Sequence, residues 1–125
     1  MDMLTVLLVD DEPDIRAIGE LSLATFAGWQ IIPAGSGEEA LLRLAETKPD
    51  LVLLDVMMPG LDGPGTLARM RATENGRSVP IIFMTARTQR SEVQEYLSLG
   101  AIGVIAKPFE PLSLADDIRK IMAAS

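Results

Sequence analysis

Five short apolar runs, set apart by segments of mixed polarity, constrain the fold of this chain more than any other feature of its sequence. Most of the runs are nearly continuous and do not alternate with polar residues. This pattern is typical of parallel strands that are buried on both faces of a sheet. The runs cover residues 4–9, 29–34, 51–56, 79–85 and 102–106. We therefore predict five strands in one parallel sheet.

The segment that begins at Ser36 carries a clear helical pattern. Ser36 and Glu39 have the spacing of a capping box, and Leu41, Leu44 and Ala45 then fall on one helix face. The final segment is equally regular, since an apolar stripe at helical spacing runs along it and a proline suited to a first helical turn precedes the stripe. These residues are Pro111, then Leu114, Ile118, Ile121 and Met122.

Three further helices are predicted between the strands. One follows Asp11, although Gly19 weakens it, and one follows Gly65. The third begins at about Ser91 and ends near Gly100, which suits a helix C-terminus. Strands and helices then alternate strictly, and this order implies right-handed crossovers. We predict an α/β fold of one domain over residues 1–125, a three-layer α/β/α sandwich around a doubly wound parallel sheet.

Composition excludes several classes of function. The chain of 125 residues has no Cys and no His, so it has no thiol nucleophile, no thiolate metal site and no imidazole base. A formal net charge of -7 argues against direct nucleic-acid binding. No apolar run is long enough to cross a membrane, and the N-terminus does not look like a signal peptide. We expect a soluble, cytoplasmic protein without a membrane partner.

Polar residues follow four of the apolar runs, where the strands are predicted to end. They are Asp10 and Asp11, Asp55, Thr85 and Lys107. Each one alone fits a turn, a helix cap or a solvated surface charge. Together at one sheet edge, however, the three carboxylates would repel one another unless a cation such as Mg²⁺ compensates. A carboxylate held between Mg²⁺ and a lysine, with a hydroxyl nearby, is suited to receive a phosphoryl group.

Four sequence blocks closely resemble the signatures of response-regulator receiver domains of bacterial two-component systems. They are "LLVDDEP", "LVLLDVMMPGLDG", "IIFMTA" and "AKPF", in the family's order and spread over essentially the whole chain. The resemblance implies a flavodoxin-like sheet of strand order 2-1-3-4-5.

The resemblance also assigns roles to individual residues. Asp55 matches the aspartate that accepts the phosphoryl group. Asp11, Asp55 and the backbone carbonyl of Met57 match direct Mg²⁺ ligands, and Asp10 matches a ligand that acts through water.

Two further family positions would contact the phosphoryl group. Thr85 matches the hydroxyl that turns inward to the phosphoryl oxygen, and Lys107 matches the lysine that pairs with it. Pro108 matches a proline whose preceding peptide bond is typically cis in the family.

The absence of histidine fits such a protein, because the donor would be a phosphohistidine on a partner. The partner would be a sensor histidine kinase or a histidine phosphotransfer protein, docked against the first helix and the loop after Lys107. The chain would catalyse only its own phosphorylation and dephosphorylation, so it would be no enzyme in the usual sense. Its output would be contact with a downstream protein target, through the fourth helix, the fifth strand and the fifth helix.

One position departs from the family pattern. Three residues before the lysine the family commonly has Tyr or Phe, and here the residue is Val104. A β-branched aliphatic side chain has no ring to bury or expose. We therefore expect the signal to pass through the loop after Thr85 and the helix that contains Tyr96, coupled to the final helix.

Met57 and Arg87 occupy positions that flank the phosphoryl group in the family and govern its lifetime. Each lies two residues after a key residue, Asp55 or Thr85. The simpler interpretation is that Met57 covers the pocket rim and Arg87 is a solvated surface charge.

Three other kinds of protein must be distinguished from a phosphorylated receiver. An aspartyl-phosphate phosphatase would have an acid two residues after the nucleophile, where this chain has Met57. A nucleotide- or flavin-binding module on the same fold would need a Gly-rich phosphate loop, and neither common pattern is present. A receiver-like module that is never phosphorylated would have lost some of the five polar residues. The chain could equally be a complete regulator or a receiver from a hybrid kinase or a longer regulator.

Overall fold

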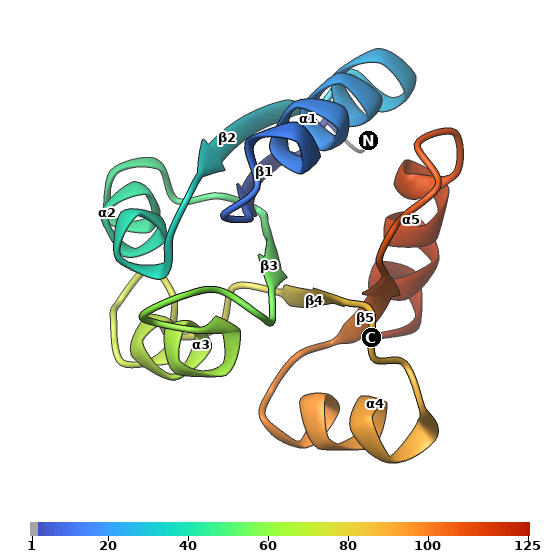
Figure 1. Ribbon diagram of the computed structural model, residues 1–125. Helices are drawn as coiled ribbons and strands as arrows, with labels where there is room; N and C mark the ends of the chain where they lie inside the picture. Colours follow the sequence, from blue (N-terminus) through green and yellow to red (C-terminus); the bar gives the residue numbers. More distant parts are fainter. Residues whose placement is uncertain (1–2) are drawn as a thin grey trace.

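The computed structural model describes residues 3–125, and within them five parallel strands alternate with five helices (Figure 1). The strands are β1 (Thr5–Val9), β2 (Gln30–Ala34), β3 (Leu51–Asp55), β4 (Ile81–Thr85) and β5 (Gly103–Ala106). The helices are α1 (Pro13–Ala27), α2 (Gly37–Thr47), α3 (Gly63–Arg71), α4 (Arg90–Ser98) and α5 (Leu114–Ala124). The predicted alternation of strands and helices is confirmed.

The strands pair in the order β2-β1-β3-β4-β5, which confirms the predicted flavodoxin-like sheet. The chain starts in β1, runs outward to β2, and then crosses back to β3 on the other side of β1. The strand order therefore reverses between β1 and β3. In open α/β sheets of this kind, ligands bind beyond the carboxyl ends of the strands at that reversal point.

Two separate apolar cores lie on the two faces of the sheet. Successive residues of β1 alternate between them: Val6 and Leu8 face the layer of α1 and α5, whereas Leu7 and Val9 face α2, α3 and α4. Figure 1 shows these helix layers on opposite sides of the strands. All residues of β3 and β4 are buried, because both faces of the central strands are covered. This explains why those runs are continuously apolar.

The apolar runs predict the strands to within one or two residues. Trp29 precedes β2 and Val79 precedes β4, yet both are buried against the helices. Apolar residues just outside the hydrogen-bonded ladder therefore still contribute to the core, and hydrophobicity alone overestimates the length of a strand.

The helix ends agree with the sequence patterns except in the cap of α2 and at the start of α5. Ser36 caps α2 by accepting a hydrogen bond from the Glu39 N–H at 3.0 Å, but the Glu39 carboxylate accepts from Gly35 N, not from Ser36 N. Pro111 lies in a turn, and α5 begins only at Leu114. The carbonyl of Pro111 instead accepts a hydrogen bond from the Ser22 hydroxyl of α1. This bond ties α1 to the loop before α5.

Gly19 does not interrupt α1, which continues through it to Ala27. A Cβ at Gly19 would lie 2.8 Å from Cδ2 of Leu8 on β1. The glycine therefore costs some helix propensity but permits a close approach of α1 to the sheet. Among residues 3–125, no helix has the length and apolar character needed to span a membrane.

Candidate functional site

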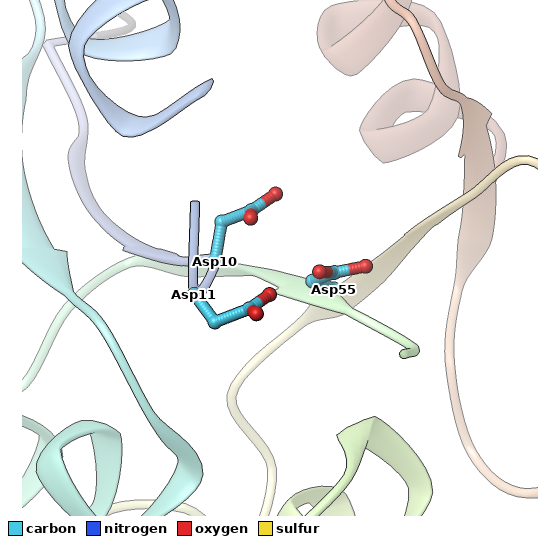
Figure 2. A group of neighbouring side chains, drawn as sticks. All are labelled: Asp10, Asp11 and Asp55. Atoms are coloured by element: carbon cyan, nitrogen blue, oxygen red, sulfur yellow. The ribbon is translucent and has the colours of Figure 1, made fainter. Parts of the chain in front are cut away.

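Three carboxylates meet at the carboxyl edge of the sheet, where its strand order reverses. Asp10 and Asp11 directly follow β1, and Asp55 is the last residue of β3. One oxygen from each of the three lies within 4.8 Å of the others. Figure 2 shows the three side chains gathered where β1 and β3 end. Asp10 and Asp55 are buried and Asp11 is half-buried, so this cluster is partly shielded from solvent.

Lys107, which directly follows β5, is the cation beside this cluster. Its Nζ lies 2.8 Å from Asp10 Oδ2, 3.4 Å from Asp55 Oδ2 and 3.6 Å from Glu12 Oε1. Burial by itself would lower the pKa of Lys107. The hydrogen bonds and negative charges of Asp10 and Asp55 outweigh this effect, and the pKa lies above its ordinary value. Lys107 therefore remains an ammonium group at neutral pH.

Asp55 is the carboxyl group that this environment perturbs most. Burial raises its pKa, and the negative charge of Asp10 raises it further. Lys107 and the Met57 N–H, which donates to Asp55 Oδ1 at 3.3 Å, act in the opposite direction. The net result is a pKa of about 6. One ammonium group therefore does not fully compensate the carboxylates, and another cation in the cluster would be stabilising.

A cavity of about 220 Å³ opens beside Asp55. Its lining residues come from four loops at this edge: Glu12, Asp55, Met57, Thr85, Ala86 and Lys107. Thr85 is buried at the end of β4, and its Oγ1 accepts a hydrogen bond from the Arg87 N–H at 3.0 Å. The fold thus brings the five predicted residues, Asp10, Asp11, Asp55, Thr85 and Lys107, to one edge of the sheet.

The sequence of this chain matches a known protein family. The sequence profile described as "Response regulator receiver domain" matches residues 6–119. This chain therefore belongs to the response-regulator receiver family. It is 43% identical over 117 residues to the "Probable transcriptional regulator ycf27" of Pyropia yezoensis, a match that covers 94% of this chain and 46% of that protein. The chain spans about half the length of the curated relatives that it matches.

Solved structures agree with this assignment. Chemotaxis protein CheY4 of Vibrio cholerae superposes with a TM-score of 0.88 at 31% identity, covering 96% of this chain and 99% of that one. The receiver domain of sensor histidine kinase PA1611 from Pseudomonas aeruginosa PAO1 superposes with a TM-score of 0.83 at 30% identity, covering 98% and 99%. That structure has a magnesium ion coordinated in its active site cleft. The fold and the signalling class of this receiver are thereby established.

The two residues predicted to tune the receiver lie in different surroundings. Met57 is 66% exposed and lines the cavity beside Asp55, as expected for a residue at its rim. The Arg87 guanidinium instead extends toward α4, where it lies 3.8 Å from the Glu92 carboxylate. Its side chain lines a neighbouring hollow and not the cavity of Asp55.

Val104 lies away from the carboxylates, in the middle of β5. It pairs in register with Phe83 of β4 and packs, half-buried, against the core on the α4 side of the sheet. It also borders a hollow of about 400 Å³ between β5 and α5. The Lys107–Pro108 peptide bond is cis, as the family resemblance predicted.

Glu12 is a member of the site that the sequence analysis did not identify. Its carboxylate lines the cavity and lies 3.6 Å from Lys107 Nζ. The available signal was its place directly after Asp10 and Asp11, in the block "DDE". An exposed acid at the start of a helix is ordinary, however, and it is the position of Lys107 that gives the Glu12 carboxylate a partner in the site.

Proposed function

We propose that this receiver accepts a phosphoryl group on Asp55 from a phosphohistidine in a Mg²⁺-dependent reaction. The observation that carries the proposal is the position of Asp55, which shares one partly buried cluster with Asp10 and Asp11 and lies 3.4 Å from the Lys107 ammonium group. In the transfer, a carboxylate oxygen of Asp55 would attack phosphorus as the phosphorus–nitrogen bond of the donor breaks. The bonding electron pair would return to the donor imidazole.

The donor set of the cluster fits Mg²⁺. Carboxylate oxygens are hard ligands, and Mg²⁺ commonly takes one or two of them and retains several waters. Asp11, Asp55 and the backbone carbonyl of Met57 would be direct ligands, and Asp10 would act through water. Bound there, Mg²⁺ would neutralise charge on the phosphoryl oxygens. The magnesium ion in the related PA1611 receiver supports this assignment.

Thr85 and Lys107 would hold the transferred group. Both line the cavity beside Asp55. The Lys107 ammonium group would pair with one phosphoryl oxygen, and the Thr85 hydroxyl would turn from the Arg87 N–H to donate to another. Met57, at the rim of the cavity, would then influence how easily water reaches the acyl phosphate, and Arg87 would do so once its guanidinium group left Glu92. The receiver would thus catalyse its own phosphorylation and dephosphorylation only.

The surface of α1 and the neighbouring loop suits the phosphohistidine donor. Ile18 and Leu21 on α1 are 44% and 70% exposed, and Leu112 in the loop before α5 is 71% exposed. The hydrogen bond from Ser22 to Pro111 holds this loop against α1. Ile18 and Leu21 lie on the helix that follows the Asp10–Asp11 loop and Leu112 lies on the loop that follows Lys107, so a docked partner would cover them. We assign this surface to a sensor histidine kinase or a histidine phosphotransfer protein.

The output would leave through α4, β5 and α5, the elements nearest to Val104. Because Val104 has no ring that could change position, the loop after Thr85 and the α4 residue Tyr96 would carry the change. We propose that residues 1–125 form one receiver domain that works in the cytoplasm, where ATP is available to the kinase. It would signal by protein contact and not by binding nucleic acid itself. Its target would be a separate protein or, as in a longer regulator, another domain.

Incubation with Mg²⁺ and acetyl phosphate, followed by intact-mass measurement, tests the proposal. The wild type should gain the mass of one phosphoryl group, and Asp55→Asn should gain none. An adduct on both proteins would move the acceptor away from Asp55. An adduct on neither would contradict the proposed phosphorylation. Omitting Mg²⁺ should also prevent the adduct.

A further inference from the structure

Arg16, in the first turns of α1, contacts the backbone of the acidic cluster and none of its carboxylates. Its Nη1 donates a hydrogen bond to the carbonyl oxygen of Asp10 at 2.7 Å, and the arginine is half-buried. That carbonyl belongs to the peptide group that joins Asp10 to Asp11. Arg16 therefore holds the link between two carboxylates of the cluster.

The other polar groups of Asp10 are also held in place. Its N–H donates to the Ala34 carbonyl of β2 at 3.1 Å. Its Oδ1 accepts from the Glu12 N–H at 2.9 Å, and its Oδ2 accepts from Lys107 Nζ at 2.8 Å. With the bond from Arg16, every hydrogen-bonding group of Asp10 has a partner. The direction of Asp10 is therefore fixed by four different elements or loops.

The carboxylate of Asp11 is held quite differently. Within residues 3–125 it has neither a hydrogen bond nor an ion pair. Its direction therefore depends on the backbone from which it projects, and one side of that backbone is the peptide group held by Arg16. Rotation of this peptide would change φ of Asp11 and swing its carboxylate relative to Asp55. The Arg16 bond thus constrains the backbone on the N-terminal side of Asp11, and the bond from the Glu12 N–H to Asp10 Oδ1 constrains it on the C-terminal side.

The guanidinium group is packed against Gly35, in the loop between β2 and α2. A Cβ at Gly35 would lie only 3.1 Å from Nη1 of Arg16. The Gly35 N–H is fixed in turn by the Glu39 carboxylate, at 2.7 Å. The absence of a side chain at Gly35 therefore leaves the space in which Arg16 reaches the Asp10 carbonyl.

We propose that Arg16 is a positioning residue for Mg²⁺ binding: by holding the Asp10–Asp11 peptide, it aims the Asp11 carboxylate at the metal. This inference rests on the proposed function, because it concerns the same Mg²⁺ site. Groups that orient metal ligands without touching the metal commonly change its affinity by roughly 10- to 100-fold. Arginine suits the task because its guanidinium group stays protonated at every physiological pH and its donors have a fixed geometry.

Four variants test the inference. Arg16→Ala removes the hydrogen bond, and Arg16→Lys keeps a charged donor on a shorter, more flexible side chain. Gly35→Ala leaves Arg16 in place but crowds its guanidinium group. Arg77→Ala is the matched control, since it removes one positive charge from an exposed position in the α3–β4 loop, at the opposite edge of the sheet. Each variant changes neither a proposed metal ligand nor the proposed acceptor.

Mg²⁺ affinity is measured by calorimetric titration of the metal-free proteins. We expect Arg16→Ala to bind Mg²⁺ about 10-fold more weakly than the wild type. Arg16→Lys should recover much of the affinity, Gly35→Ala should weaken it in the same direction, and Arg77→Ala should leave it unchanged. In the metal-free state, the amide resonance of Asp11 should move in Arg16→Ala, because its own peptide group loses a hydrogen bond.

The free energy of unfolding, measured in EDTA, separates positioning from loss of structure. If Arg16→Ala does not fold, Gly35→Ala still decides the matter, because it keeps Arg16 but crowds its guanidinium group. Unchanged Mg²⁺ affinity in folded Arg16→Ala, or in Gly35→Ala where Arg16→Ala does not fold, would overturn the inference while leaving the proposed function intact. An equal loss in Arg77→Ala would also overturn it, since net charge would then explain the effect. A wild type that binds no Mg²⁺ would overturn both proposals.

Discussion

The Nζ atom of Lys107 lies 2.8 Å from Oδ2 of Asp10, although the two residues are 97 positions apart in the sequence. The Asp10 side chain is fully buried and that of Lys107 is 13% exposed, so water screens their interaction only weakly. The same ammonium group lies 3.4 Å from Asp55. A single lysine thus links the ends of β1, β3 and β5.

Replacing Lys107 with Met should destabilise the metal-free protein. The substitution leaves the buried Asp10 carboxylate without its cation, and breaking a buried pair in this way costs about 3 kcal/mol. Urea denaturation at pH 7 in EDTA measures the change in the free energy of unfolding. Lys120→Met, at an exposed position of α5, is the control and should have little effect. A loss in Lys107→Met no larger than in the control would show that Asp10 does not depend on Lys107.

Asp55→Asn should stabilise the metal-free protein at neutral pH but not in acid. The pKa of Asp55 is about 6 in the folded protein and 3.8 ordinarily, so the folded state binds this proton more tightly than the unfolded state. Ionisation of Asp55 therefore opposes folding, and stability is lost as the pH rises from about 4 through about 6. Above that range the penalty is on the order of 3 kcal/mol.

Urea denaturation of the wild type and Asp55→Asn at pH 4 and pH 8, in EDTA, checks this prediction. The variant should exceed the wild type in stability at pH 8, and the difference should shrink at pH 4. A constant difference between the wild type and Asp55→Asn across this range would mean that Asp55 titrates normally.

The strand pattern allowed the sheet and the main site residues to be predicted, because parallel strands deliver their following residues to one edge. Asp10, Asp55, Thr85 and Lys107 each end or follow an apolar run, so topology alone brings them together. The contacts of Glu12 and Arg16 could not be predicted in this way. They depend on side-chain rotamers and on how closely α1 approaches the sheet, which Gly19 permits.

The start of α5 shows a second limit of sequence patterns. Pro111 favours a first helical turn, but its carbonyl is used by Ser22 of α1, and the helix begins at Leu114. A tertiary hydrogen bond thus overrides a local preference. The capping pattern at Ser36 was reliable because its main hydrogen bond, from Glu39 N to Ser36 Oγ, is local to the helix.

Gly63→Ala should destabilise the fold and disturb Asp55. A Cβ at Gly63 would lie 2.5 Å from the Asp55 carbonyl oxygen and 2.8 Å from the Val56 Cα atom. These are backbone atoms, so the strand end or α3 must move, at a cost of about 2 kcal/mol. Gly65→Ala is the control, since the nearest atoms to its Cβ belong to the side chains of Leu61 and Asp62.

Urea denaturation and the rate of phosphorylation by acetyl phosphate measure the two effects. Gly63→Ala should lose more stability than Gly65→Ala, and its rate of phosphorylation should fall. Wild-type stability in Gly63→Ala would show that the end of β3 can shift without cost. Wild-type phosphorylation in a destabilised Gly63→Ala would show that the shift does not reach the Asp55 carboxylate.

Thr85→Ala should separate phosphorylation from signalling. In the structure Thr85 Oγ1 accepts the Arg87 N–H, and in the proposed phosphorylated state the hydroxyl turns to the phosphoryl group. The Arg87 N–H then loses its acceptor, so the loop that leads into α4 is released. Phosphorylation of the wild type should therefore shift the amide resonances of Arg87 and of α4, including Tyr96. Tyr96 can report the change because it packs edge-on against Phe83 of β4, with ring centroids 5.3 Å apart.

In Thr85→Ala the Arg87 N–H has no hydroxyl acceptor in either state, so the α4 shifts on phosphorylation should be much smaller. Intact mass should still show a phosphoryl adduct, because the acceptor Asp55 is unchanged. Thr85→Ser, which retains the hydroxyl, is the matched control and should behave like the wild type. Full-size α4 shifts in phosphorylated Thr85→Ala would mean that the signal reaches α4 without the hydroxyl.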